Sequence, residues 1–395
     1  MPDLKGTRGE NNSPRPSAEE QAPLKPALIK EIERRIAEKG KITFAEFMEL
    51  ALYWREGGYY TSQPGVWGRG GDYITSLDVS PIFSKIIAKQ IHEMWAILGR
   101  PGEFELVEAG AGRGILSKGI LDTIQAHYPE LFEIIKIRLI EKNPNLREKA
   151  AGRITWHESL DELAPFCGCI LSNELIDSFP VHRVIFIEGK LKEIYVGYDG
   201  SSFVDVIGEP STDALERYFK DLGVELSDGH ITEVNLAAKE WIRKAASLLK
   251  TGFVITIDYG YHGLELYAPH RKGSLLCHFR HTLNDNPYIN IGSQDITTHI
   301  DFTTLVREGQ MSGLNLTGYT TQKDFLLGLG IHEELMEAGT DPKMAEHERI
   351  NFNRAIARLI MPDGMGDIFK VLIQHRNLQK PALKGLSFRD ISRYL

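Results

Sequence analysis

The sequence is poor in cysteine, with three residues in a chain of 395. Cys167 and Cys169 are separated by one glycine, and Cys277 stands alone. Three cysteines exclude a disulfide framework, and the Cys167-Gly-Cys169 pair has too few neighbouring ligands for a zinc site. We expect all three to be small, buried residues of a protein from a reducing compartment.

Long apolar runs and an excess of basic residues are also missing. No apolar run approaches the roughly 18 residues that a membrane-spanning helix needs. The 46 Lys and Arg are outnumbered by 54 Asp and Glu, which gives a formal net charge of −8. This balance argues against a nucleic-acid partner, because such proteins need cations to neutralise phosphates. The hydrophobic share of 42% is that of a globular protein.

The N-terminal part has two kinds of sequence. Residues 1–27 are rich in proline and acidic residues, which predicts a disordered lead and not an Arg-rich transit peptide. For residues 28–100 we expect helices and a lid loop. Thr43-Phe-Ala-Glu46 has the capping-box pattern that opens a helix.

The loop is the glycine- and tyrosine-rich stretch from Gly57 to Ser76. Loops of this length in compact enzymes are commonly lids or binding segments. Its residues Tyr59, Tyr60 and Tyr73 are candidates to stack on an adenine ring or to close the site. A surface loop held by aromatic side chains is the alternative.

The stretch from Phe104 to Leu121 organises the rest of the chain. A β-prone run ends at Glu108, glycines follow at positions 110, 112 and 114, and apolar residues then recur at helical spacing. This pattern predicts a strand, a tight turn and a helix. Residues without Cβ allow backbone N–H groups and a helix N-terminus to approach a ligand closely. A nucleotide-like cofactor is therefore expected at this turn.

The spacing of the glycines indicates which cofactor. Gly110-Ala-Gly112-Arg-Gly114 does not match the G-x-G-x-x-G pattern that holds a dinucleotide pyrophosphate. A carboxylate such as Glu108 suits the cationic methionyl end of S-adenosyl-L-methionine, directly or through water. Glu141 ends the next apolar run, where a ribose diol is held in folds of this kind. A structural glycine turn with two incidental acids is the alternative.

Strands alternate with helices after this turn, which predicts a doubly wound α/β sheet with ligands at the carboxyl ends of its strands. Further strands are expected at 154–156, 169–171, 253–259, 314–319 and 368–374, and a hairpin insertion turns at Glu188-Gly-Lys190. We expect the core to comprise residues 101–180, 250–262 and 301–376, an inserted α+β substrate-binding lobe 181–249 and 263–300, and a tail 377–395.

These motifs, in this order, resemble the MidA (DUF185) family of class I methyltransferases, which includes the mitochondrial arginine methyltransferases that act in complex I assembly. The likeness extends from Gly57 to about Gln374. The family commonly has proline where this chain has Ala111, a change that leaves the turn's backbone intact. The matching segments are Gly58-Tyr59-Tyr60, Gly71–Ser76, Glu108–Gly114, Asn173-Glu174 with Asp177 and Pro180-Val181, Asp258–Tyr261, Gln294–Phe302 and Met365–Val371.

The resemblance implies a seven-stranded Rossmann-like sheet whose last strand is antiparallel, with S-adenosyl-L-methionine as cofactor. It also implies methylation of arginine in a protein, which is a complex I subunit for the mitochondrial members. The cofactor-binding residues are then Glu108, Gly110, Gly112, Gly114, Glu141, Tyr59, Tyr60, Tyr73 and Asn173.

Methyl transfer to arginine needs carboxylates, because a guanidinium is always protonated and a poor nucleophile. Glu174 is our candidate for binding it, with Asp177 as partner and Asn173 orienting cofactor or nucleophile. An alternative makes Asp177 and Asn173 turn and cap residues only. Candidates to line the acceptor pocket are Asp258, Tyr259 and His281.

Other functions are kept as alternatives. These are a methyltransferase for a small molecule or nucleic acid, and a non-catalytic assembly factor that keeps the fold. Asp295, His299 and Asp301 are expected to be turn, cap or satisfied polar residues and not metal ligands, with Asp301 the N-cap of a helix from Phe302. We expect no nucleic-acid partner and no membrane span, a bacterial cytoplasmic or alternatively mitochondrial matrix location, and a homo-oligomer as one option.

Overall fold

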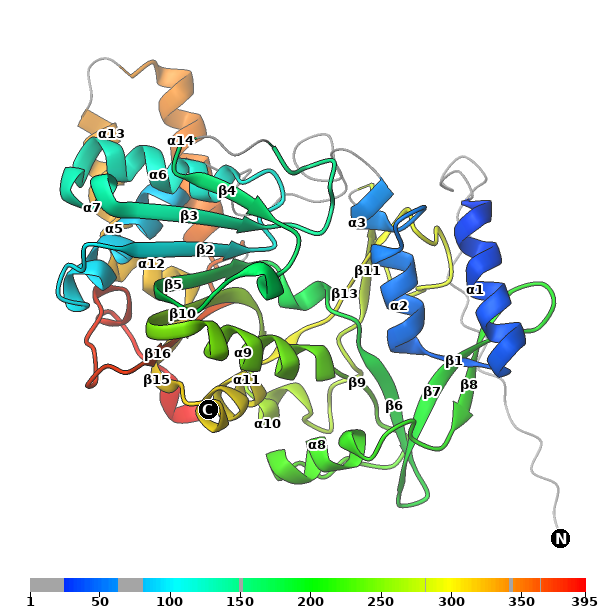
Figure 1. Cartoon of the computed structure of the whole chain (residues 1–395). Helices are drawn as coiled ribbons and strands as arrows, with labels where there is room; N and C mark the ends of the chain where they lie inside the picture. The colour runs from blue at the N-terminus through cyan, green and yellow to red at the C-terminus, as the bar shows by residue number, and fades with distance from the viewer. Residues whose placement is uncertain (1–24, 63–80, 149–151, 281, 341–343, 363) are drawn as a thin grey trace, which may run out of the picture.

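The computed structural model describes residues 25–62, 81–148, 152–280, 282–340, 344–362 and 364–395. Residues 1–24 of the expected lead 1–27, residues 63–76 of the expected loop with Tyr73, and His281 lie outside the described residues. The first helix begins at Pro26, so the last two residues of the expected lead are helical. No helix among the described ranges is long and apolar enough to cross a membrane. The chain forms two connected regions, a large sheet covered by helices and a smaller region of strands flanked by α1 and α2 (Figure 1).

The large sheet follows the order β15-β16-β10-β5-β2-β3-β4, and a two-residue strand, β14, pairs with the end of β10. Strands β2, β3, β4, β5 and β10 are parallel, whereas β16 runs antiparallel to β10 and β15. The antiparallel last strand and the doubly wound order are thus confirmed. The strands are β2 (Phe104–Ala109), β3 (Ile135–Ile140), β4 (Ile154–His157), β5 (Phe166–Asn173), β10 (Leu249–Tyr261), β14 (Ile300–Asp301), β15 (Asn315–Thr321) and β16 (Phe369–Arg376).

Helices cover both faces of this sheet. Alternate residues of each strand face opposite sides, so Leu106 and Ile255 pack in one apolar cluster while Val107 and Val254 pack in another. The first cluster contains α5 (Ile82–Ile97), α6 (Ile115–His127), α7 (Pro129–Ile134), α12 (Gln322–Gly328) and α14 (Glu346–Ile360), with α13 (Ile331–Thr340) beside α14. The second contains α9 (Leu236–Leu248) and α11 (Phe302–Met311).

The smaller region is built mainly from residues 182–234 and 263–297. Its five-stranded sheet includes the expected hairpin, in which β6 and β7 are antiparallel with Ile187 opposite Lys190. The helix α9 lies in the range predicted for the inserted lobe, but it packs on the core sheet. The other predicted domain boundaries stay predictions. Its elements are β1 (Ile42–Thr43), β6 (His182–Ile187), β7 (Lys190–Tyr198), β8 (Phe203–Gly208), α8 (Ala214–Leu222), β9 (Ile231–Val234), α10 (Gly263–Leu266), β11 (Leu276–Phe279), β12 (Thr282–Asn284) and β13 (Asp295–Thr297).

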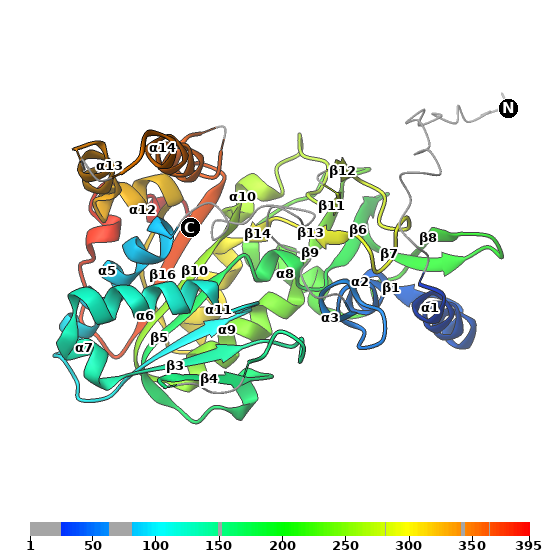
Figure 2. The same cartoon turned by 90° about the horizontal axis from the view of Figure 1, so that it is seen from above.

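Two N-terminal helices pack on this smaller region, at the opposite end of the molecule from α13 and α14 (Figure 2). They are α1 (Pro26–Lys39) and α2 (Phe44–Tyr53), and the short α3 (Tyr59–Ser62) follows them. The expected helix start at Thr43 is confirmed, because the Thr43 hydroxyl accepts a hydrogen bond from the Glu46 backbone N–H. Short 3-10 turns occur at Leu160–Glu162, Ile176–Ser178, Lys384–Leu386 and Ser392–Tyr394.

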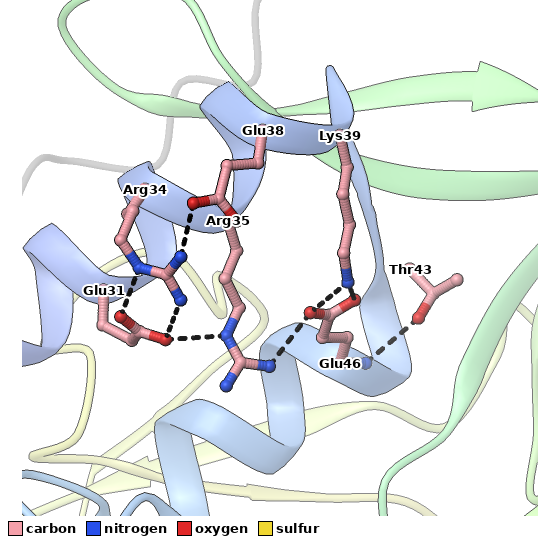
Figure 3. Close-up of polar contacts among 7 residues, drawn as sticks. All are labelled: Glu31, Arg34, Arg35, Glu38, Lys39, Thr43 and Glu46. Carbon is pink, nitrogen blue, oxygen red and sulfur yellow. Dashed lines mark hydrogen bonds and ion pairs between the residues drawn. The ribbon is translucent and has the colours of Figure 1, made fainter.

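Ion pairs fix α1 against α2. Glu46 of α2 accepts from Arg35 at 3.0 Å and from Lys39 at 2.8 Å, both on α1, as Figure 3 shows. Burial raises the pKa of Glu46, but the hydrogen bonds from Lys39 and Arg35 outweigh it, so the net shift is downward. A carboxyl whose pKa is lowered on folding stabilises the fold at pH values above its ordinary pKa. This contribution is lost as the pH falls through the lowered pKa.

We expect Glu46→Gln to lower the free energy of unfolding by about 0.5–1 kcal/mol at pH 7, because the ion pairs are only partly screened by solvent. The difference from the wild type should shrink as the pH falls below 4.5, the ordinary value of the carboxyl. Urea unfolding followed by circular dichroism at several pH values measures it. Glu38→Gln, which removes a solvent-exposed pair with Arg34, is the control and should change little. Equal losses in both variants would contradict a special role for Glu46.

Candidate functional site

A cavity of about 570 Å³ opens at the carboxyl ends of β2, β3 and β5. Ala109, Ile140 and Asn173, the last residues of these strands, all line it. Ligands bind at this edge of doubly wound sheets. The other lining residues include Glu49, Tyr53, Tyr60, Gly110, Gly112, Arg113, Glu141, Lys142, Leu160, Asp161, Glu174, Ser178, Phe179, Trp241 and Lys244.

Gly110 and Gly112 of the glycine turn form the floor of this cavity, whereas Gly114 does not line it. Gly110, Gly112 and Gly114 have φ values of +72°, +53° and +68°, a region that favours residues without Cβ. A Cβ on Gly110 would lie 2.7 Å from a methyl group of Leu175. The turn is tied to the next strand, because Gly110 and Ala111 donate to the Ile140 carbonyl at 3.0 Å. The predicted strand, turn and helix are therefore confirmed.

Glu141 lies beside the turn and lines the cavity, where the ribose of a nucleotide was expected. One carboxylate oxygen accepts from the Gly112 N–H at 2.9 Å and the other from the Asn143 N–H at 2.8 Å. Burial raises the pKa of Glu141, and these two hydrogen bonds oppose the rise. An ionised carboxylate has lone pairs beyond the two in use, so Glu141 can also accept from a diol.

Glu108 lies behind the turn and not in the cavity wall. Its buried carboxylate accepts from the Ser117 backbone N–H at 3.1 Å, in the first turn of α6. Burial raises the pKa of Glu108 to about 7. Glu108 thus holds the start of α6 against β2, and its expected contact with a methionyl group, directly or through water, stays a prediction.

Asn173 and Glu174 lie together at the end of β5, as predicted. The Asn173 amide donates to a Glu174 carboxylate oxygen at 3.1 Å, and its own carbonyl oxygen is buried without a hydrogen-bond partner among the described residues. Glu174 has φ +51°, unusual for a residue with a side chain, and donates its N–H to the Ile257 carbonyl. This backbone places the Glu174 side chain in the cavity wall.

Asp177 and Asp258 are buried behind Glu174, and the partly buried Tyr259 lies beside them. One Asp258 oxygen accepts from the N–H groups of Leu175, Ile176 and Asp177, and the other from its neighbour Tyr259. The Tyr259 hydroxyl donates to Asp177 at 2.5 Å. Burial raises the pKa of both aspartates. None of the three lines the cavity, so these residues hold the Glu174 loop, and the acceptor-pocket role expected of Asp258 and Tyr259 stays a prediction.

The two described tyrosines of the expected lid have different positions. Tyr59 is completely buried in the apolar cluster of α1 and α2. Tyr60 lines the cavity, donates from its hydroxyl to Asp295 at 2.8 Å, and accepts at its carbonyl from Asn143. Tyr60 alone of this pair can therefore contact a bound ligand.

Sequence reasoning missed several lining residues. Leu160 and Asp161 follow β4, and Trp241 and Lys244 come from α9, on the far side of the cavity. The first two could have been found by extending the strand-end rule to β4. For α9, the sequence shows only an amphipathic helix, and the surface that it buries depends on the tertiary packing.

Asp301 caps α11 as predicted, accepting from the Thr303 and Thr304 N–H groups. Asp295 accepts from Tyr60 and from the Ile296 N–H. Within the described ranges, no group of three or more His, Cys, Asp or Glu side chains is placed to hold a metal ion.

A family model described as "Putative S-adenosyl-L-methionine-dependent methyltransferase" matches residues 86–320, more than half of the chain. The chain belongs to this family. It thereby belongs to the S-adenosyl-L-methionine-dependent methyltransferases, and the match includes the glycine turn, Glu141 and Glu174. The resemblance inferred from the motifs is confirmed.

Solved structures and named relatives agree with this family. A Burkholderia thailandensis protein described as a "likely methyl transferase", bound to S-adenosyl-homocysteine, superposes with a TM-score of 0.84 at 29% identity, covering 94% of this chain and 97% of its own. The zebrafish (Danio rerio) mitochondrial protein arginine methyltransferase NDUFAF7 is 27% identical over 87% of this chain and 86% of its length. The human protein of the same name is 25% identical over 89% and 84%.

The cavity fits the family's cofactor. Its volume is in the range of small-molecule sites, and the glycine turn leaves backbone exposed at its floor. The unpartnered Asn173 oxygen is an acceptor for the ammonium of a methionyl group, and Glu141 is one for a ribose diol. Asn173, Glu141 and the glycine turn would therefore hold S-adenosyl-L-methionine.

Proposed function

We propose that this methyltransferase acts on arginine side chains of a protein. The observation that carries the proposal is the position of Glu174: a strained backbone at the end of β5 places its carboxylate in the cavity wall, beside the unpartnered oxygen of Asn173. The names of the NDUFAF7 relatives, which are protein arginine methyltransferases, support the same acceptor.

The chemistry follows from the charge of the acceptor. S-adenosyl-L-methionine supplies, when bound, a methyl group on a positively charged sulfur. A guanidinium nitrogen would accept this methyl group, S-adenosyl-homocysteine would leave, and the methylated nitrogen would then lose a proton. Glu174 binding two guanidinium N–H groups would draw the positive charge away from the attacking nitrogen and take up the proton. Most of the rate enhancement would come from alignment in the cavity.

Asp177 and Asn173 have supporting roles in this proposal. The Asp177 carboxylate accepts a hydrogen bond from the Tyr259 hydroxyl, and its backbone carbonyl accepts one from the Thr298 N–H. Asp177 therefore stabilises the loop that carries Glu174. Asn173 donates to Glu174 and orients its carboxylate. We extend the proposal, from the resemblance, to a subunit of respiratory complex I as the acceptor. We further propose a bacterial cytoplasmic location, or alternatively the mitochondrial matrix, since the named relatives are mitochondrial. A homo-oligomer is part of the same proposal.

The proposal is tested in two steps with the purified protein. Calorimetry should show saturable binding of S-adenosyl-L-methionine and none of NAD. The protein is then incubated with a cell lysate and S-adenosyl-L-methionine carrying a deuterated methyl group, and the products are analysed by mass spectrometry. We expect deuterated methyl groups on protein arginine. Label found only on lysine, nucleic acid or a small metabolite would overturn the choice of acceptor.

A further inference from the structure

We propose that Tyr53 and Glu49 of α2 recognise the cationic acceptor side chain, at a place where the ammonium of Lys142 now lies. This inference rests on the proposed function, since it assigns the groups that receive the arginine. Both α2 residues line the cavity, and both precede residue 86, where the match to the family model begins.

The Tyr53 ring is held in the cavity wall beside Ser178. Its hydroxyl lies 2.8 Å from the Ser178 hydroxyl and donates to the Ser178 carbonyl at 3.1 Å. Ser178 is four positions beyond Glu174, and both residues line the cavity. The ring of Tyr60 stacks on Tyr53 with centroids 5.4 Å apart. These contacts fix the orientation of the ring.

A cation already occupies this place. The Lys142 ammonium lies 4.4 Å from the centre of the Tyr53 ring and 3.7 Å from a Glu49 carboxylate oxygen. An aromatic face combined with a carboxylate is an arrangement that binds cations. Lys142 and Glu49 keep 59% and 50% of their side chains exposed, so their pairing contributes little and is easily broken.

A guanidinium is a better occupant than an ammonium. It is planar, stacks on aromatic rings and is more weakly hydrated, so less is lost when it leaves water. An incoming arginine can thus replace Lys142 over Tyr53, with Glu49 on α2 and Glu174 on the β5 loop as carboxylate partners. Lys142 then acts as an internal competitor for the acceptor.

α2 is anchored firmly enough to hold such a site. The Glu46 ion pairs join it to α1 (Figure 3), and its buried side chains pack in the cluster shared with α1 and β7. The recognition residues are therefore positioned by the fold of the N-terminal helices before any acceptor arrives.

The test uses the full chain saturated with S-adenosyl-homocysteine, and measures binding of a short peptide with one arginine against the same peptide with neutral citrulline. We expect Tyr53→Leu to weaken arginine-peptide binding about 10-fold, because it removes a cation–π contact. Lys142→Ala should tighten the same binding several-fold, which a merely structural role would not do. Citrulline-peptide binding should not respond to Lys142→Ala.

The controls distinguish a loss of acceptor recognition from a loss of folding and from a failure of the proposed function. Tyr198→Leu and Lys136→Ala remove exposed residues of the same types away from the cavity and should leave both affinities as in the wild type. Lys142→Ala without effect, or with weaker arginine binding, would overturn the inference. Loss of S-adenosyl-homocysteine affinity in Tyr53→Leu would overturn it too. Failure of the proposed function shows instead as absence of labelled arginine with the wild-type protein.

Discussion

Gly112→Val should abolish binding of S-adenosyl-L-methionine, with at least a 100-fold loss of affinity. Gly112 has φ +53°, lines the cavity, and donates its N–H to Glu141 at 2.9 Å. A β-branched side chain disfavours this backbone, costing about 1–2 kcal/mol in strain alone, and it would project from the floor of the site. The strained turn would also release Glu141. Calorimetry with the cofactor measures the loss.

Gly189 offers a matched control for this substitution. It also has a positive φ, +75°, but it lies in the β6–β7 turn and a Cβ there would meet nothing within 4 Å. Gly189→Val should therefore reduce stability by the strain alone and retain cofactor binding. If both valine variants bind S-adenosyl-L-methionine equally well, the glycine turn is not the cofactor site.

Glu174→Gln should reduce methyl transfer at least 100-fold while changing cofactor affinity less than 2-fold. Glutamine keeps the size and the hydrogen-bonding reach of the side chain but cannot balance the guanidinium charge or accept its proton. The measurements are single-turnover transfer to the arginine acceptor and calorimetric titration with S-adenosyl-L-methionine. A loss in transfer with intact binding locates the defect in the chemical step.

Glu188→Gln is the control for a glutamate in the same backbone conformation as Glu174. The two residues have the same φ, +51°, and Glu188 lies in the hairpin turn outside the cavity. Glu188→Gln should transfer methyl groups at the wild-type rate. Full activity in Glu174→Gln would show that the acceptor is bound and deprotonated by other groups.

The parts of the site whose positions the sequence predicted correctly are those that residues close in the sequence determine. The glycine turn needs only its own three glycines, and Glu141 and Asn173 sit at strand ends that hydrophobic runs delimit. Glu108 lies at the end of the predicted strand, but the sequence did not show that its carboxylate accepts a hydrogen bond from the start of α6. This outcome depends on how tightly the helix closes on the strand, which a pattern of residue types does not contain.

The residues that the sequence did not predict come from distant segments. Tyr53 on α2 and Trp241 on α9 line the same cavity as Glu174, yet each belongs to a helix whose pattern shows only that one face is buried. Asp258 was expected to line the acceptor pocket, but it does not line the cavity and its oxygens accept from four backbone N–H groups. Which polar groups a buried carboxylate satisfies is decided by the packed structure.

The hydrogen bonds that close the cavity span large sequence separations. Tyr53 and Ser178 are 125 residues apart, and Tyr60 and Asp295 are 235 apart. Contacts of this range form late, after most of the loop-closure entropy has been lost. A ligand that binds only the finished cavity adds its binding energy to the stability of the whole chain. The cofactor would then raise the free energy of unfolding as its concentration rises. We expect the protein to be degraded by proteases more slowly when the cofactor is abundant.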